Sequence, residues 1–288
     1  MQRYYCVACK HPFQSIRRPA RQLKKLFHQY VWGKQNLTQL GAGEGRSAKW
    51  VRQQLSRVTP EVASLTPGPT VMIADVTFWG KYYGVCVFRS PHLKKNLWWT
   101  EVERETTAVY REGKFVLEQQ EWTLPAIVID GRRGVATFFA RPGIPVQICH
   151  FHQMKTVTKY LTRKPLLRAS QELRFLTMTL PRTDEVTFTK QLDQWYERWQ
   201  PIVDEKTYII GYKHWYYTHH RVRAAYRSLR TNVPYLFTYQ KYPELHIPNT
   251  TNSLDGMFSQ LKNRLNVHRG ARPKFRYKII TEILSGEH

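Results

Sequence analysis

The chain has 288 residues, with 45 lysines and arginines against 21 aspartates and glutamates, and its formal net charge is +24 with neutral histidines. An excess of this size, spread over the whole length, predicts a polyanionic partner. No apolar run approaches the ~20 residues of a membrane-spanning helix, and the first residues lack the apolar core of a signal peptide. We therefore expect no membrane partner and a cytoplasmic location, where the four cysteines stay reduced instead of forming a disulfide framework.

Two cysteines near the start, Cys6 and Cys9, have the spacing of one half of a zinc ribbon. Three interpretations stay open. The other half is missing because of a late start or a truncated gene, His11 and His28 complete an unusual site, or the pair binds nothing. We favour the first, so Zn²⁺ at this partial site is one alternative among three.

The next segment predicts a helix-turn-helix, with helices at 36–40 (NLTQL) and 46–57 (RSAKWVRQQLSR) and a turn at 41–45 (GAGEG). Four side chains of the second helix suit base edges in a major groove: Arg46, Lys49, Arg52 and Gln53. The alternative is a pair of basic helices that face solvent.

A change of composition follows, because residues 59–70 contain three prolines and a glycine. We expect a small basic helical DNA-binding region at 1–59, a linker at 60–68 and a second domain at 69–288.

The second domain begins with β-branched and aromatic runs that predict strands, interrupted by helical spacing. The expected strands are 70–78, 82–90, 96–102, 124–130 and 144–149, and the expected helices are 105–120 and 132–140. Three antiparallel strands followed by two strands that helices separate match a ribonuclease H-like α/β fold with a mixed sheet. In that fold one acid lies on the first strand and another just after the fourth, where this chain has Asp75 and Asp130.

From about residue 164 to 246 the pattern is helical, which predicts an insertion before the last helix. Within 219–230, three arginines share one helix face and are expected to contact DNA: Arg223, Arg227 and Arg230. Three aromatic residues near them are assigned mainly to the core: Trp215, Tyr216 and Tyr226.

Three acids are candidate ligands of a divalent metal: Asp75, Asp130 and Asp255. A carboxylate inside the strand MIADVTF costs several kcal/mol unless a cation or hydrogen bonds compensate, and a salt bridge to an arginine is the alternative to a metal. For Asp130 the alternative is an ordinary turn, and for Asp255 it is a capping box with Asn252. If the three carboxylates converge, they predict a Mg²⁺ site of the kind used in phosphoryl transfer on nucleic acid.

The helix that starts near Asp255 has a core stripe of Leu254, Phe258, Leu261 and Leu265. Its basic side chains are available to the DNA backbone: Lys262, Arg264 and Arg269.

The segments IADVTFWG, VIDGRRG, QICHFHQMK and IPNTTNSLDGMFSQLKNRLNVHRG resemble the catalytic blocks of bacterial insertion-sequence transposases of the Mutator-like DDE superfamily. The resemblance runs from about residue 69 to the end. It implies a ribonuclease H-like core with an all-helical insertion, dependence on Mg²⁺ or Mn²⁺, and DNA strand cleavage and transfer at the ends of an insertion sequence.

The same resemblance implies an active-site supporting role for Cys149 and His152. By residue type alone, packing explains the pair better, since two ligands cannot close a zinc site. Asp255 stands where the family has glutamate, and aspartate is shorter by roughly 1.5 Å. The implied partners are terminal inverted repeats and target DNA, both double-stranded, bound by a homodimer or larger assembly at the nucleoid. The alternative is a catalytically inactive DNA-binding remnant or regulator.

Overall fold

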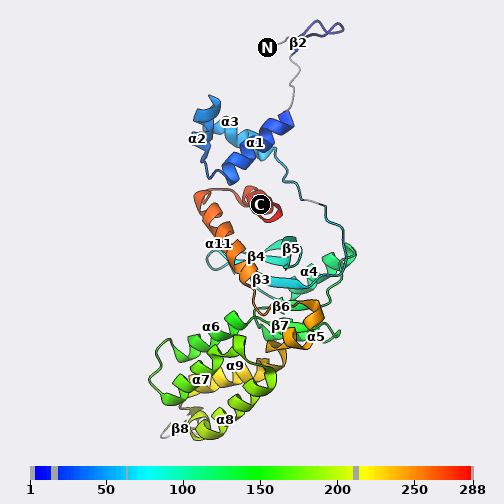
Figure 1. Cartoon of the computed structure of the whole chain (residues 1–288). Helices are drawn as coiled ribbons and strands as arrows, with labels where there is room; N and C mark the ends of the chain where they lie inside the picture. Colours follow the sequence, from blue (N-terminus) through cyan, green and yellow to red (C-terminus); the bar gives the residue numbers. More distant parts are fainter. Residues whose placement is uncertain (1–3, 14–18, 63, 210–213, 287–288) are drawn as a thin grey trace. The chain divides into compact units, whose positions relative to one another are not determined.

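The structure is a computed structural model that describes residues 4–13, 19–62, 64–209 and 214–286 (Figure 1). The chain divides into two compact units. The smaller unit combines Met1–Ser64 with Phe258–His288, and the larger is Leu65–Met257. Residues 258–288 thus belong with the N-terminal helices and not with the rest of the domain predicted at 69–288.

The larger unit contains a five-stranded mixed sheet, which confirms the α/β class predicted from the sequence. Its strands are β3 (Met72–Phe78), β4 (Gly84–Ser90), β5 (Lys95–Val102), β6 (Ile127–Ile129) and β7 (Val146–Ile148). Their order in the sheet is β5-β4-β3-β6-β7. The pairs β3–β4 and β4–β5 are antiparallel, whereas β3–β6 and β6–β7 are parallel. Short turns join the antiparallel strands and helices join the parallel ones, as chain direction requires.

Two of those crossover helices pack together on the sheet: α4 (Thr107–Gln119) on β4 and β5, and α5 (Arg133–Ala140) on β6 and β7. Their buried side chains form one core with alternate residues of the strands, including Met72, Ala74 and Phe88. Gly113 allows α4 to approach closely, because a Cβ there would lie 2.6 Å from Phe88. Strand alternation puts Ile73 and Asp75 on the opposite face of the sheet.

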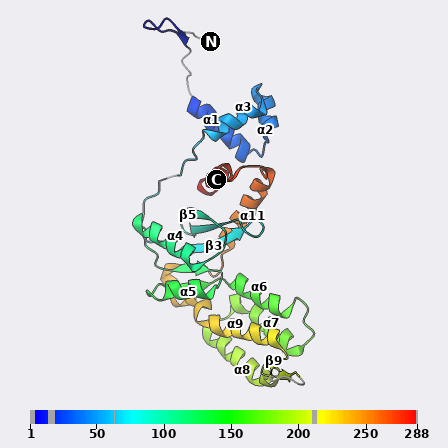
Figure 2. The ribbon, with the colours of Figure 1, turned by 180° about the vertical axis from the view of Figure 1, so that it is seen from behind.

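The remaining helices of this unit lie together beyond β7 (Figures 1 and 2). They are α6 (His150–Leu161), α7 (Arg168–Met178), α8 (Glu185–Val203), α9 (His220–Leu236) and α10 (Thr238–Lys241), with 3₁₀ turns η1 (Leu180–Arg182) and η2 (Pro243–Leu245). The end of α9 and the start of α10 are tied to the edge strand β7. Gln147 Nε2 donates to the Leu236 carbonyl at 2.8 Å, and Thr238 Oγ1 donates to the Val146 carbonyl at 2.6 Å. These bonds cover an edge that would otherwise expose unpaired backbone groups.

A short hairpin within this helical part corrects one prediction. Strands β8 (Lys206–Tyr208) and β9 (Trp215–Tyr217) pair antiparallel, and Trp215 and Tyr216 are 43% and 52% exposed instead of buried in the core. The prediction assumed that Trp215 and Tyr216 lie on a helix packed into the core. They lie instead on a two-stranded hairpin, which has no second layer of structure to cover both of its faces. Tyr226 does pack, stacked on Tyr196 with ring centroids 4.6 Å apart.

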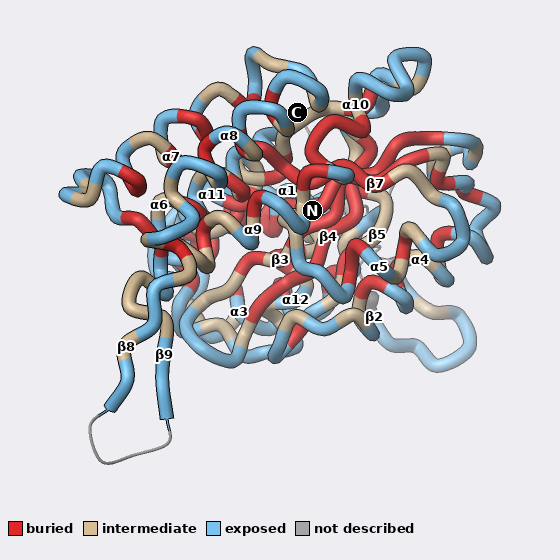
Figure 3. Tube along the Cα trace, turned by 90° about the horizontal axis from the view of Figure 1, so that it is seen from below, coloured by how far each residue is buried: buried red, intermediate tan, exposed pale blue. Residues whose placement is uncertain are grey.

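The smaller unit consists of α1 (Pro19–Val31), α2 (Leu37–Glu44), α3 (Ala48–Ser56), the part of α11 (Asn252–Val267) from Phe258 onward, and α12 (Pro273–Ser285), besides the short hairpin of β1 (Tyr4–Tyr5) and β2 (Pro12–Phe13). Buried aromatic rings hold its helices together. Tyr30 stacks on His268 at 3.9 Å between ring centroids, and Phe27 packs edge-on against Phe275. In each unit the buried residues gather where elements pack, as the red segments of Figure 3 show.

Two predicted boundaries in the helices were wrong. The expected turn at 41–45 is largely helical, because α2 continues to Glu44 and ends at Gly45 with a φ of 62°, and Ser47 then caps α3. At the other end, α11 begins at Asn252, so the residue before the helix is Thr251 and not the predicted cap Asn252. Within the described part of the chain, none of the helices has both the length and the apolar character that crossing a bilayer requires.

Candidate metal centre

The register of the sheet brings Asp75 and Asp130 to the same level. Parallel pairing sets Met72 opposite Ile127 and Ile73 opposite Val128. If the same register is continued past the end of β6, Asp130 comes opposite Asp75. Alternation also places both on the sheet face away from α4 and α5. Their carboxylates therefore belong to one region of that face. Strand β6 itself ends at Ile129, directly before Asp130, whereas β3 continues to Phe78.

Asp75 is a buried acid, with only 7% of its surface exposed. Its Oδ1 accepts a hydrogen bond from the Val76 amide at 2.7 Å. Burial, first, and then the negative charge of Asp130 together raise the pKa of Asp75 to about 7. Among the described residues no lysine or arginine forms a salt bridge with Asp75, so the alternative explanation by an arginine partner is wrong.

Backbone hydrogen bonds bring the starts of α6 and α11 to this sheet edge. The Cys149 amide donates to the Ile129 carbonyl at 2.8 Å, directly before Asp130. The His150 amide donates to the Asn249 carbonyl at 2.9 Å, which fixes the segment that leads into α11. Two stretches about 100 residues apart in sequence are therefore adjacent at the end of β6 and β7.

Thr251 links the side chains that meet there. Its Oγ1 lies 3.4 Å from Cys149 Sγ, 3.3 Å from His152 Nδ1 and 3.3 Å from Asp255 Oδ2, and its amide donates to Cys149 Sγ at 3.3 Å. A hydroxyl has one proton to donate, so these contacts are alternatives for it. Thr251 is fully buried and is a site residue that sequence reasoning missed.

Cys149 and His152 form a hydrogen-bonded pair. Burial alone raises the pKa of the Cys149 thiol, but hydrogen bonds from His152 and Thr251 outweigh it, and the net pKa is lowered. The pKa of His152 is raised to about 9, first by the hydrogen bond with Cys149 and then by the charges of Cys149, Asp75 and Asp255. Without a bound ion, cationic His152 thus offsets part of the negative charge of the cluster, and an ion that binds the ring nitrogen has to displace its proton.

Ligand atoms of Asp75, His152 and Asp255 all lie within 4.8 Å of one another. Asp130, which was predicted as the third carboxylate, is not in this group, although its charge acts on Asp75. Oxygen and imidazole donors at this spacing, around a buried acid that pairs with no lysine or arginine among the described residues, fit a divalent ion. The cluster contains Asp75 and Asp255 as predicted and adds His152 as a third donor.

A further carboxylate, Glu105, lies beside this group. Burial and the charge of Asp130 raise its pKa, while Tyr110 donates to its Oε1 at 2.9 Å. Arg132 also approaches it, at 3.7 Å from Oε2. The sequence offered no signal for it, because Glu105 is the third glutamate of the segment EVERE, which begins inside β5 at Glu101.

Three of the four residues predicted to read DNA lie on α3 and the fourth, Arg46, lies in the turn before it, all in the smaller unit. Arg46, Lys49, Arg52 and Gln53 are all exposed, and Arg46 lies over the Trp50 ring. Arg269 is exposed too, whereas Arg264 donates to the Trp32 carbonyl at 3.2 Å and lies 4.3 Å from the centre of its ring. Lys262 is half-buried.

The arginines predicted to bind DNA from α9 have protein partners in two of three cases. Arg223 pairs with Asp204 and lies over the Tyr217 ring, and Arg230 pairs with Asp193 at 3.0 Å. Arg227 is exposed. Ion pairs with Asp204 and Asp193 neutralise two of the charges that the helix pattern had assigned to DNA.

Cys6 and Cys9 lie in the turn between β1 and β2, where the Lys10 amide donates to the Cys6 carbonyl at 2.9 Å. Within the residues that the structure describes, the groups of three or more potential ligands do not include either cysteine. Both cysteines are free.

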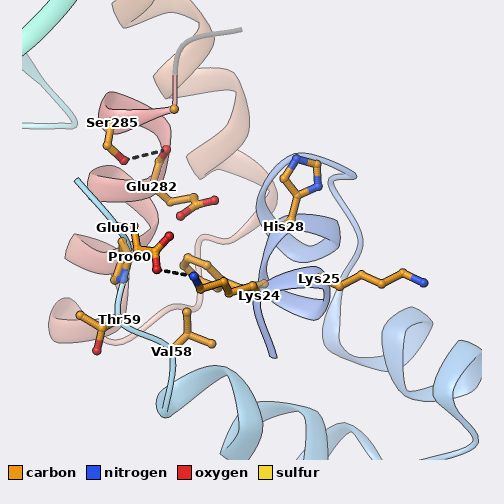
Figure 4. A pocket seen from close by; sticks show the side chains of 11 residues that line it. Lys24, Lys25, His28, Val58, Thr59, Pro60, Glu61, Glu282 and Ser285 are labelled. Carbon is orange, nitrogen blue, oxygen red and sulfur yellow. Dashed lines mark hydrogen bonds and ion pairs between the residues drawn. The ribbon is translucent and has the colours of Figure 1, made fainter. Parts of the chain in front are cut away.

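The smaller unit has a hollow of about 490 Å³ between α1, the segment after α3, and α12 (Figure 4). Lys24 and Glu61 form an ion pair across it. None of the predicted catalytic residues lines this hollow, so it contributes nothing to the metal centre.

A scan of the chain against protein-family models found no match, and a search of curated proteins found no significant similarity. The functional assignment therefore rests on the residues and their geometry.

Proposed function

We propose that this protein is a DDE-type DNA transposase with a ribonuclease H-like core, which cleaves and transfers DNA strands at the ends of an insertion sequence. The observation that carries the proposal is the group of Asp75, Asp255 and His152, with Asp130 beside it, on one face of a mixed sheet. The resemblance of the surrounding segments to Mutator-like transposases and the net charge of +24 support it.

In this proposal, the Asp75 carboxylate is shared by two metal-ion positions. The charges of both Asp130 and Asp255 act on Asp75, so Asp75 would hold two divalent ions, Mg²⁺ or Mn²⁺, one with each partner. Bound in this way, the ions would activate an attacking water or 3′ hydroxyl and stabilise the departing 3′ oxygen. The reaction breaks one phosphorus–oxygen bond and forms another, with the proton of the attacking group released to solvent.

Recognition of the element ends is assigned to the smaller unit. The exposed side chains of α3 supply major-groove donors and acceptors, and Gly45 to Ser47 form the short turn that precedes this helix. Double-stranded terminal repeats and target DNA are the proposed substrates, bound by a homodimer or larger assembly.

The decisive experiment is cleavage of DNA that carries the flanks of this coding sequence, in Mg²⁺ or Mn²⁺. We expect nicking at the element ends, lost in Asp75→Asn and in Asp130→Asn but retained in Glu197→Gln, whose side chain is exposed on α8. Binding of the same DNA, measured by fluorescence anisotropy, should persist in every variant.

If the parent chain binds DNA but cleaves none with either ion, the enzyme assignment is wrong. The protein is then better described as a DNA-binding remnant or regulator, for which the replacement of the family's glutamate by Asp255 is the relevant sequence feature.

A further inference from the structure

The metal centre contains a nitrogen donor that an all-carboxylate site lacks. A ring nitrogen of His152 and one oxygen each of Asp75 and Asp255 lie within 4.8 Å of one another. Ligands that share one ion at about 2.1 Å are separated by roughly 3 to 4.2 Å. Small side-chain rotations therefore suffice to bring all three atoms to a single ion.

Neighbouring polar groups hold the His152 ring in place. It lies in the first turn of α6, next to Cys149 Sγ, and its Nδ1 is 3.3 Å from Thr251 Oγ1. Thr251 is in turn fixed by its own amide, which donates to Cys149 Sγ. Hydrogen bonds of this kind behind a histidine orient the ring and raise its affinity as a ligand.

We propose that His152 is a direct ligand of the ion shared by Asp75 and Asp255, and that this position selects a first-row transition ion over Mg²⁺. Imidazole suits transition ions, whereas Mg²⁺ prefers oxygen ligands and keeps several waters. The position shared by Asp75 and Asp130 has carboxylate donors and suits Mg²⁺. The proposal rests on the proposed function for the identity of the reaction, but the ligand assignment can be tested without any reaction.

The direct test is electron spin echo spectroscopy of the full-length chain loaded with Mn²⁺. We expect ¹⁴N modulation from a coordinated imidazole, and a change of its frequency when the chain is labelled with ¹⁵N-histidine. The modulation should disappear in His152→Gln and remain in His220→Gln, a control at an exposed position of α9.

Affinity provides a second readout. We expect His152→Gln to weaken Co²⁺ binding about tenfold or more, and Mg²⁺ binding less than about twofold, as measured by calorimetry. Equal losses for both ions overturn the selectivity. Absence of histidine modulation in the labelled wild-type chain overturns the ligand assignment, and that measurement does not depend on the folding of any variant.

The two proposals fail separately. Mg²⁺-dependent cleavage without nitrogen modulation leaves the transposase assignment standing and removes His152 as a ligand. Modulation without cleavage, with any divalent ion, confirms the ligand and overturns the assigned reaction.

Discussion

A buried carboxylate that pairs with no lysine or arginine destabilises a folded chain, and within the part of the chain that the structure describes Asp75 is such a residue. Its pKa is about 7 in the fold against 3.8 in a model peptide, so the folded chain binds the proton more tightly. Stability of the metal-free chain must then fall as pH rises from about 4 to about 7. The same charge that costs stability in the absence of metal is the one that binds a cation.

Asp75→Asn should therefore stabilise the metal-free chain at pH 8, by at most about 4 kcal/mol, and much less at pH 4. Urea unfolding in EDTA at both pH values measures this, with Glu197→Gln as the surface control. Added Mg²⁺ should raise the stability of the wild type and leave Asp75→Asn unchanged. A variant less stable than the wild type at pH 8 would show that the carboxylate has compensating partners.

Substitutions at Asp255 test whether the proposed centre has adjusted to an aspartate, which is shorter than the family's glutamate. Its carboxylate already lies within 4.8 Å of the Asp75 and His152 ligand atoms, so a glutamate would extend roughly 1.5 Å too far. We expect Asp255→Glu to lower cleavage by about 100-fold in single-turnover assays, and Asp255→Asn to abolish it while DNA binding persists. Faster cleavage by Asp255→Glu would instead mean a site that has drifted from the family's glutamate.

At the scale of the element, the start of α11 controls the geometry of the centre. Thr251 precedes the helix, and its hydroxyl contacts Cys149, His152 and Asp255. This hydroxyl therefore sets the positions of the His152 and Asp255 side chains. Because the residue is buried, a change there alters geometry without altering the surface.

Thr251→Val should reduce cleavage by about tenfold or more, whereas Thr251→Ser, which retains the hydroxyl, should stay near the wild-type rate. The Mn²⁺ affinity should change in the same order, and circular dichroism checks that both variants fold. Equal cleavage rates in the two variants would show that Thr251 contributes only packing and that its hydroxyl is not needed.

The helix α3 offers the matching prediction for recognition. Replacing Gln53 by alanine should reduce the preference for terminal-repeat DNA over random DNA by about 1 to 3 kcal/mol, since a base contact is lost. Competition binding measures the preference. Lys190→Ala, at an exposed position of α8, should leave it unchanged. Uniform weakening on both DNAs would assign Gln53 to the backbone and not to bases.

At the scale of the whole molecule, a net charge of +24 makes phosphate neutralisation the expected source of affinity. Log K for DNA should fall linearly with log salt, with a slope of about 0.9 per phosphate contact, between about 50 and 200 mM. Anisotropy titrations at four salt concentrations give the slope. Affinity that does not change with salt would remove the argument from charge.

The sequence alone predicted the strands of the sheet and singled out two of the three residues that meet in the candidate metal group, Asp75 and Asp255. Alternating and apolar runs are local signals, so β3, β4 and β5 were found within about two residues, and Asp75 was singled out because an acid inside such a strand is costly. The stripe of Leu254, Phe258 and Leu261 was likewise confirmed as buried. The local sequence pattern was sufficient to predict a residue's secondary structure and burial wherever these depend mainly on the helix or strand that contains the residue.

Only the tertiary structure decided which residues meet. His152 and Thr251 join the carboxylates through backbone bonds between Cys149 and Ile129 and between His150 and Asn249, contacts that no periodicity encodes. Arg223 and Arg230 gained acidic partners from α8 and the turn after it, and residues 258–288 packed with the N-terminal helices. Each of these outcomes depends on contacts between distant segments, because a side chain's partners are set by the packing of other elements and not by its own neighbours in the chain.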